Sequence, residues 1–227
     1  MHIPTRDEIQ HNTIEYLRTA GGTRPDLRIV DLPTGRIVVK DFKKSSLAFS
    51  LLIGPVLTYR ERCALSKLVG VKGVPQLIGR IDRYAFAMEY LPGTSLDRQI
   101  DKSPGEEFYK DLARVVDNIH SRGVAHCDLY SRGNVILGDD GQPYIVDFAA
   151  CVLRGGKLNI LMRTLFNQFV RADEKAVLRI KRRLSPGLLT KEEKQELDTP
   201  LPLDRPARAF STFFRSTIRF LFVKKRQ

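Results

Sequence analysis

The sequence predicts an α+β fold of two lobes: a reduced, strand-rich lobe over residues 1–90 that begins with a helix, and a truncated helical lobe over residues 91–227. Short β-type segments separated by turn residues fill most of the first part, whereas longer segments with apolar residues at helical spacing fill the second. A polar cluster surrounds one hairpin in residues 123–150. With 227 residues, 42% of them hydrophobic, the chain is long enough to bury a sizeable core.

The first predicted element is a helix. Thr5 and Glu8 have the spacing of a capping box, so we expect the helix to begin after Thr5, to run to about Arg18 and to end at Gly21 and Gly22. Its inward face would carry Ile9, Thr13, Tyr16 and Leu17.

A strand hairpin follows the helix. Its strands are expected over residues 27–30 and 37–42, with a turn at residues 33–35, and Lys40 lies near the end of the second strand. Two further strands are predicted at residues 76–81 and 84–90.

The helix predicted between Pro55 and Val69 carries an acid on its apolar face. Glu61, Leu65 and Leu68 share that face because they are spaced at helical intervals. The leucines would bury this face against the sheet and so direct Glu61 inward. Since an inward acid without a cationic partner is costly, we predict an ion pair between Glu61 and Lys40.

Helices dominate the second lobe. We expect the strand before it to break at Pro92 and Gly93, and a core helix to open at Ser103 and Pro104. The apolar positions of that helix are Phe108, Leu112, Val115, Val116 and Ile119. Beyond residue 150 we expect helices at about 160–184, 190–197 and 206–225, with a turn at 185–187 and a proline-rich link before the last.

The polar cluster is built around a hairpin with apolar strands at residues 135–137 and 144–146 and a turn at 139–141. Asn134 enters the first strand and Asp147 leaves the second, so both lie at the same open end of the hairpin. Asp128 lies on the loop leading in. Carboxylate and amide oxygens are the ligands that magnesium prefers, and a further carboxylate can orient an attacking hydroxyl.

These residues resemble the motifs of the protein-kinase-like superfamily. Residues 126–129 read His-Cys-Asp-Leu and resemble the catalytic loop, residues 147–149 read Asp-Phe-Ala and resemble the metal motif, and residues 38–40 read Val-Val-Lys and resemble the phosphate-contacting lysine element. Two departures are that Asn134 follows Asp128 by one residue more than in eukaryotic kinases, and that Ala149 replaces a glycine. In outline the chain is similar to small bacterial lipopolysaccharide-core and Kdo kinases, or to RIO-type atypical kinases.

The resemblance implies a kinase that uses ATP and Mg²⁺. Asp128 would orient the acceptor hydroxyl, Asn134 and Asp147 would hold the metal, and Lys40 braced by Glu61 would neutralise phosphate charge. His126 would be a scaffold residue bonded to backbone near Asp147.

The resemblance also suggests how the nucleotide would be held. Backbone groups of Glu89 and Leu91, in the run between the lobes, would take the adenine edge. Gly22, beside Gly21, is open to two interpretations: it belongs to a loop that covers the phosphates, or it only ends the first helix.

Three functions stay open. The favoured one is transfer of the ATP γ-phosphate to a hydroxyl of a bacterial lipopolysaccharide or glycolipid sugar. The alternatives are a RIO-like serine/threonine protein kinase or ATPase, and a nucleotide-binding pseudokinase scaffold. The sequence carries no A-P-E element after Ala150, which favours the first.

The net charge of +12 is uneven along the chain. Residues 1–150 hold 20 Lys and Arg against 19 Asp and Glu, whereas residues 151–227 hold 18 against 7. This asymmetry suggests an anionic partner for the last third, or only a solvated basic surface. Aromatic residues interleaved with lysines on a sheet are not evident, which disfavours nucleic acid without excluding it.

The last predicted helix, residues 206–225, has the composition of an interfacial helix. Its apolar residues, Phe210, Phe213, Phe214, Ile218 and Leu221, lie on one face, and arginines line the other. It would either dock on an anionic membrane or pack on the second lobe and close its core.

Cysteine usage and hydropathy predict the compartment. Cys63, Cys127 and Cys151 have no metal-ligand or redox spacing, and residues 1–10 lack an apolar leader core. We therefore expect a cytoplasmic protein, which could lie peripherally on the inner face of the cytoplasmic membrane.

Overall fold

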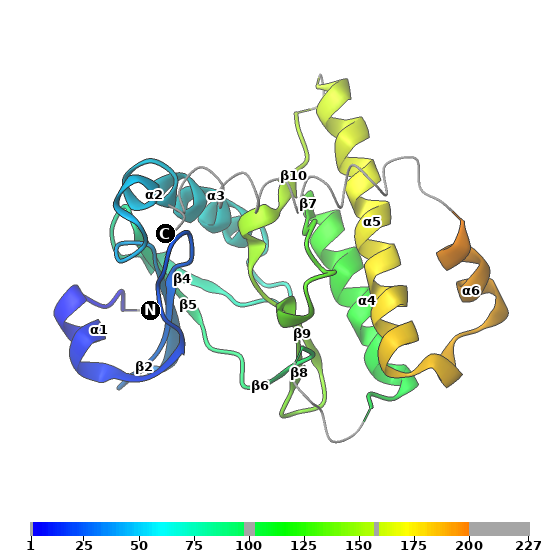
Figure 1. The fold of residues 1–227 in the computed structure, drawn as a ribbon, viewed down its shortest axis with the longest axis horizontal. Helices are drawn as coiled ribbons and strands as arrows, with labels where there is room; N and C mark the ends of the chain where they lie inside the picture. The colour runs from blue at the N-terminus through cyan, green and yellow to red at the C-terminus, as the bar shows by residue number, and fades with distance from the viewer. Residues whose placement is uncertain (1, 98–102, 157–158, 200–227) are drawn as a thin grey trace, which may run out of the picture. The chain divides into compact units, whose positions relative to one another are not determined.

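The computed structural model describes residues 2–97, 103–156 and 159–199, apart from the side chains of residues 132 and 161. Within this range the chain forms two compact units, residues 2–69 with 75–90 and residues 70–74 with 91–199. The first contains an antiparallel sheet and the second is largely helical (Figure 1), so the predicted α+β fold class is confirmed.

The first unit is built on a five-stranded antiparallel sheet with the strand order β1-β2-β3-β5-β4. Its strands are β1 (Thr13–Arg18), β2 (Asp26–Leu32), β3 (Gly35–Asp41), β4 (Leu77–Arg80) and β5 (Ala85–Glu89). The strands beyond β1 lie where the sequence predicts them, within a few residues. One apolar cluster between helix α1 and the sheet contains Ile9, Val30, Leu32, Ile37, Val39 and Ala87.

The leading helix α1 (Arg6–Asn12) is shorter than predicted. Its capping box is present, because Glu8 N donates to Thr5 Oγ1 at 3.2 Å and Thr5 N donates to Glu8 Oε2 at 2.7 Å. The helix ends where Asn12 Nδ2 bonds Glu8 O at 2.8 Å and Thr13 Oγ1 bonds Ile9 O at 2.5 Å. Such local side-chain bonds compete with helix continuation.

The prediction that this helix reaches Arg18 is wrong. Residues 13–18 form strand β1, which is rich in β-branched and aromatic residues and pairs antiparallel with β2. Tyr16 and Leu17 are exposed, so they do not share a buried face with Ile9.

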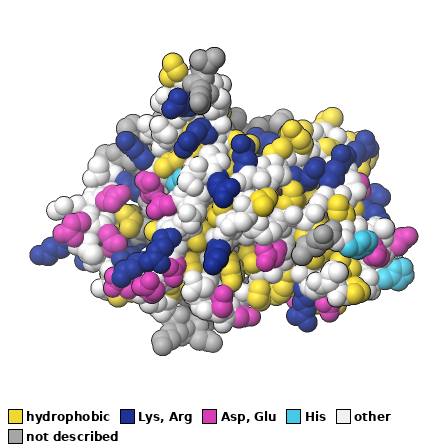
Figure 2. Space-filling model, turned by 180° about the vertical axis from the view of Figure 1, so that it is seen from behind, with side chains coloured by type: hydrophobic (Ala, Val, Ile, Leu, Met, Phe, Trp, Pro, Cys, Tyr) yellow, Lys and Arg dark blue, Asp and Glu magenta, His cyan; other side chains and the backbone are white. Residues whose placement is uncertain are grey.

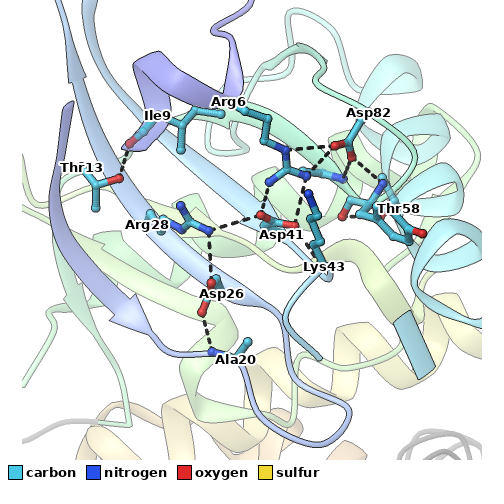
Figure 3. A network of polar contacts seen from close by, with 12 residues as sticks. Arg6, Ile9, Thr13, Ala20, Asp26, Arg28, Asp41, Lys43, Thr58 and Asp82 are labelled. Carbon is cyan, nitrogen blue, oxygen red and sulfur yellow. Dashed lines mark hydrogen bonds and ion pairs between the residues drawn. The ribbon is translucent and has the colours of Figure 1, made fainter. Parts of the chain in front are cut away.

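A network of ion pairs attaches α1 to the sheet (Figure 3). Arg6 donates to Asp82 Oδ2 from Nε and Nη2 at 3.0 and 2.6 Å, and it also pairs with Asp41 at the end of β3. Arg28 of β2 donates to both Asp41 and Asp26 at 3.2 Å. Asp41 is 1% exposed, and a carboxylate buried to this degree requires such partners.

Two helices follow β3. The helix α3 (Gly54–Lys67) matches the prediction, with Pro55 in its first turn. A short helix that the sequence analysis missed, α2 (Leu47–Leu52), precedes it and buries Phe49 against Phe42 and Leu57.

The second unit contains two long helices and two small sheets. Its helices are α4 (Glu106–Ser121), α5 (Ile160–Leu184) and α6 (Lys191–Asp198), with 3₁₀ turns η1 (Arg132–Asn134), η2 (Phe148–Ala150) and η3 (Pro186–Leu188). One sheet joins β6 (Gly93–Ser95), β8 (Val135–Gly138) and β9 (Pro143–Ile145), and the other pairs β7 (Val124–Ala125) with β10 (Val152–Leu153). Figure 1 shows α4 and α5 side by side along most of α4.

The helix α4 begins later than predicted. Its N-cap is Gly105, and Pro104 lies before the helix, where its carbonyl accepts from Ser185 Oγ at 2.9 Å. The predicted apolar face is confirmed, because all five of its residues are buried: Phe108, Leu112, Val115, Val116 and Ile119.

The remaining predictions concern the last three helices, and the structure describes the chain only as far as residue 199. The helix α5 has the predicted bounds, and α6 begins with a complete capping box between Thr190 and Glu193. The helix predicted at residues 206–225 lies outside the described residues. Within the described part of the chain, no helix has both the length and the apolar character that a membrane crossing requires.

Candidate active site

Asp128 is held in place by Asn134. The Asn134 Nδ2 atom donates to Asp128 Oδ2 and to the Asp128 backbone oxygen, both at 3.0 Å. A backbone carbonyl can only accept, so the amide nitrogen of Asn134 faces Asp128 and its Oδ1 is left to accept from, or ligate, another group. Both side chains are buried, with 5% of each residue exposed.

The hairpin fixes Asn134 relative to Asp147, as the sequence predicts. Val146 N donates to Asn134 O at 3.0 Å, and the register pairs Val135 with Ile145. Asp147 has left-handed backbone angles, φ 66° and ψ 72°, which are uncommon for a residue other than glycine. Such strain is found most often at functional sites.

His126 connects the loop of Asp128 to the strand before Asp147. Its Nε2 lies 3.0 Å from Val146 O, and its Nδ1 accepts from Asp128 N at 3.3 Å. Because the carbonyl only accepts and the amide only donates, the ring is the neutral Nε2–H tautomer. The ring of Phe148 packs edge-on at 4.9 Å. The predicted scaffold role of His126 therefore matches its contacts.

Asp173 of α5 was missed by the sequence analysis. Its carboxylate accepts from His126 N at 2.6 Å, from Cys127 N at 2.9 Å and from His120 Nε2 at 3.1 Å, and the residue is 2% exposed. The only sequence signal is an acid on a helical face that is otherwise apolar, shared with Phe169, Ala172, Ala176 and Val177. Asp173 thus anchors the backbone just before Asp128.

Cys127 occupies a strained and buried position beside Asp128. Its φ is 65°, and its Sγ donates to Ala125 O at 3.4 Å. Burial raises the pKa of this thiol well above its usual value, and the neighbouring Asp173 and Cys151 raise it further. The thiol therefore stays protonated at neutral pH and is a poor nucleophile.

The predicted ion pair between Lys40 and Glu61 is present in the first unit. Lys40 Nζ lies 2.7 and 3.0 Å from the two carboxylate oxygens of Glu61. Lys40 is 2% exposed and Glu61 is fully buried. This geometry positions a primary ammonium group at the inner face of β3, opposite α3.

Gly21 and Gly22 lie at the tip of the β1–β2 hairpin, so they do not end the first helix. The tip is closed by reciprocal backbone bonds between Gly21 and Arg24 at 3.2 and 2.9 Å, and Gly22 has φ 56°. Ser46 N donates to Gly22 O at 2.8 Å. The interpretation that Gly22 only ends the first helix is therefore wrong. The other interpretation, that Gly22 belongs to a loop covering the phosphates, stays a prediction.

Glu89 ends β5, and Leu91 begins the longer of the two segments that form the second unit. The backbone N–H of Glu89 donates to Gln76 O at 2.9 Å. If Glu89 contacts adenine, its backbone carbonyl oxygen would therefore make the contact, because its N–H is already bonded.

The residues predicted to form the site come from both units. Asp128, Asn134 and Asp147 lie in the second unit, on one loop and the two ends of one hairpin. Their oxygens could hold a hard divalent cation and accept a proton from a hydroxyl. Lys40 and Glu61 lie in the first, where an ammonium group can meet phosphate oxygens.

Solved structures show the same fold. The Rio2 kinase of Chaetomium thermophilum is similar over 90% of this chain and 65% of that chain, with a TM-score of 0.58 and 17% identity. A Rio2 kinase–ADP/Mg²⁺–phosphoaspartate complex from the same organism matches with a TM-score of 0.58, 15% identity and coverage of 90% and 64%. The chain therefore has a protein-kinase-like fold.

Sequence relatives are protein kinases matched over short stretches. The CBL-interacting serine/threonine-protein kinase 20 of Arabidopsis thaliana is 36% identical over 77 residues, 32% of this chain and 17% of that protein. The mitogen-activated protein kinase kinase kinase 17 of the same plant is 32% identical over 72 residues, 29% and 19% of the two chains. This chain thus spans less than a fifth of the length of either relative. No family model matches the chain.

Proposed function

We propose that the protein is an ATP- and Mg²⁺-dependent phosphotransferase that moves the γ-phosphate of ATP to a hydroxyl acceptor. The observation that carries this proposal is the fixed Asp128 carboxylate. It is bonded by Asn134 on a loop that His126 and Asp173 hold in place, within a protein-kinase-like fold.

In this proposal Asp128 accepts or orients the proton of the attacking hydroxyl. Asn134 Oδ1 and the Asp147 carboxylate are the oxygens that would hold Mg²⁺, which supplies charge stabilisation at the phosphates. The donor set fits this ion because hard oxygen ligands suit it, and because Asn134 already directs its amide nitrogen toward Asp128.

Lys40 would contact the phosphates of ATP, and Glu61 would keep its side chain in one conformation. The adenine edge would meet the carbonyl of Glu89 and the backbone of Leu91, and Gly22 would lie over the phosphates. These assignments are supported by the Lys40–Glu61 distances and by the place of Gly22 at a hairpin tip.

The proposed acceptor is a sugar hydroxyl of a bacterial lipopolysaccharide or glycolipid. Support comes from the short chain between β10, which ends at Leu153, and α5, which begins at Ile160, because it leaves little room for a peptide-docking segment. The basic last third supports an anionic glycolipid. The protein would then act in the cytoplasm, at the inner face of the membrane.

The second candidate is a RIO-like kinase with a protein acceptor, or a RIO-like ATPase. The similarity to the Rio2 kinase over 90% of this chain favours it. The two candidates differ in acceptor, so one assay separates them: purified protein, labelled ATP and Mg²⁺ are incubated with lipopolysaccharide core, with protein fractions, or with no acceptor.

The catalytic assignment is tested by two substitutions. Asp128→Asn should abolish transfer and spare nucleotide affinity, because it removes the proton acceptor and leaves the metal ligands. Asp147→Ala should in addition weaken Mg²⁺-dependent ATP binding, measured by calorimetry. Asp139→Asn, at the exposed turn of the same hairpin, is the matched control.

Near-normal transfer by Asp128→Asn would refute the role of Asp128. Nucleotide binding by the wild-type protein without transfer to any acceptor would instead indicate a pseudokinase scaffold.

A further inference from the structure

A cluster of three metal-binding side chains lies between α4 and α5. Asp117 and His120 come from α4 and Glu174 from α5, and one ring nitrogen and one oxygen from each acid all lie within 4.8 Å of one another. Asp117 and His120 are three residues apart, so they share a helical face. Among the described residues this is the one such group of three.

His120 makes a hydrogen bond of the kind that metal-ligating histidines commonly make. The residue is 7% exposed, and its Nε2 lies 3.1 Å from Asp173 Oδ2. Asp173 accepts two backbone N–H groups with the same carboxylate, so we infer that it accepts from His120 as well and that Nε2 is the donor. The lone pair of the ring is then on Nδ1. Metal-ligating histidines commonly donate their other nitrogen to a carboxylate in this way.

Two of the three ligands are carboxylates that lie close together. The ligand oxygens of Asp117 and Glu174 are within 4.8 Å of one another, so a cation bound between them would relieve their mutual repulsion. A cavity of about 240 Å³ adjoins Glu174 and is lined by Arg171, Glu174, Lys175, Glu196 and Thr199, which leaves space for water beside this carboxylate.

We propose that Asp117, His120 and Glu174 form a binding site for one divalent transition-metal ion, with zinc the best match to one imidazole and two carboxylates. Three protein ligands with water in the fourth position is a coordination that zinc adopts. The site takes no part in the proposed phosphotransfer. It is joined to the loop of Asp128 through His120 and Asp173, so a bound ion would strengthen the His120–Asp173 bond and restrain that loop.

Titration of the metal-free full chain with zinc tests the site. One equivalent should bind, and cobalt in its place should give the visible absorption of a low-coordinate N/O site. Asp117→Asn and Glu174→Gln are exposed, nearly isosteric changes. Each should weaken zinc binding by at least the roughly 10–100-fold that loss of an outer-shell partner costs. Glu107→Gln, an exposed acid elsewhere on α4, and Cys63→Ser should bind as the wild type does.

Hydrogen exchange tests the connection to the loop. Zinc should slow exchange of the His126 and Cys127 amides, which donate to Asp173, in the wild type but not in Glu174→Gln. The site is refuted if no stoichiometric zinc binds, if both cluster variants bind as tightly as the wild type, or if Cys63→Ser removes the binding. These readouts need no nucleotide, so they stand apart from the test of phosphotransfer.

Discussion

Two charged groups of the candidate site, Asp128 and Lys40, each have a neighbour that sets their orientation. Asn134 holds Asp128, and Asp128 N in turn bonds His126. Glu61 holds Lys40 at 2.7 Å in the core of the first unit. Such pairs cost desolvation energy, so their presence in a buried site is better explained by positioning than by stability.

The Lys40–Glu61 pair allows stability and function to be separated. Lys40→Met leaves the buried Glu61 carboxylate without its ion-pair partner and should lower the free energy of unfolding by about 3–5 kcal/mol. The double variant Lys40→Met/Glu61→Leu removes both charges and should recover most of that loss. Neither variant should transfer phosphate. Urea unfolding and a transfer assay measure the two effects.

Lys43→Met, at an exposed lysine three residues further along the chain, is the control for loss of a lysine in this region. If the double variant were as unstable as Lys40→Met, the ion pair would not act as an isolated unit. Transfer by the double variant would exclude the proposed phosphate role of Lys40.

At the scale of the elements, α5 organises the second unit. It packs on α4, and its Phe166, Phe169 and Ala172 form an apolar cluster with Ala125 and Val152 of the β7–β10 sheet. Asp173 extends this packing with hydrogen bonds to the backbone of residues 126 and 127. The loop of Asp128 is therefore fixed by a helix that follows it by more than 30 residues in the sequence.

Asp173→Asn should loosen that loop. The amide can accept at one oxygen only, so one buried backbone N–H of residues 126 and 127 loses its acceptor, at a cost of about 1.5–3 kcal/mol. Amide exchange should rise at these residues, and phosphate transfer should fall more than nucleotide affinity. Asp198→Asn, an exposed acid at the end of α6, is the control. Unchanged exchange in Asp173→Asn would contradict the anchoring role.

The attachment of α6 should depend on pH. Burial alone would raise the pKa of Glu193, but bonds from Lys181 Nζ at 2.7 and 2.8 Å and from Thr190 N at 2.9 Å lower it below its usual value of 4.5. A lowered carboxyl pKa contributes stability that is present above the unfolded value and is lost as the pH falls through the folded one.

The stability of the wild type should therefore decline as the pH is lowered below about 4.5, and Glu193→Gln should show a smaller decline. Urea unfolding followed by circular dichroism at neutral and acidic pH measures the difference. Glu107→Gln, on α4, is the control. An equal decline in Glu193→Gln and the wild type would show that this carboxylate does not contribute.

For the whole molecule, charge is the property that most distinguishes the ends of the chain. On the face drawn in Figure 2, lysine and arginine side chains are interspersed with acidic ones, as on an ordinary solvated surface. Residues 200–227, outside the described range, hold seven Lys and Arg against one Asp. The excess of basic residues is therefore strongest in that segment.

Deletion of residues 206–227 tests the predicted C-terminal helix. If the helix docks on membranes, the shortened protein should stay soluble and folded and should no longer sediment with anionic liposomes. Each basic residue near anionic lipid contributes about 1 kcal/mol, so binding by the full chain should weaken with salt. An insoluble or unfolded truncation would support packing on the second lobe instead. Absence of salt-sensitive liposome binding by the full chain would end the membrane proposal.

Local chemistry made much of the fold and part of the site predictable. The capping box at Thr5 and the apolar period of residues 160–184 depend on neighbours a few positions apart, and both are present in the structure. The hairpin that places Asn134 next to the strand before Asp147 depends on a turn of a few residues. The Lys40–Glu61 pair followed from helical spacing and the cost of an unpaired buried acid.

The sequence by itself determined the elements that short-range periodicity, turns and caps specify, together with the order of the polar residues along the chain. Tertiary structure alone decided that residues 13–18 form a strand and not a continuation of the helix, because pairing with β2 supplies the hydrogen bonds of the strand. It also decided the role of Asp173, since its bonds span 46 and 47 residues of sequence. Contacts at such separations leave no periodic pattern, and only the packing of α5 brings them together.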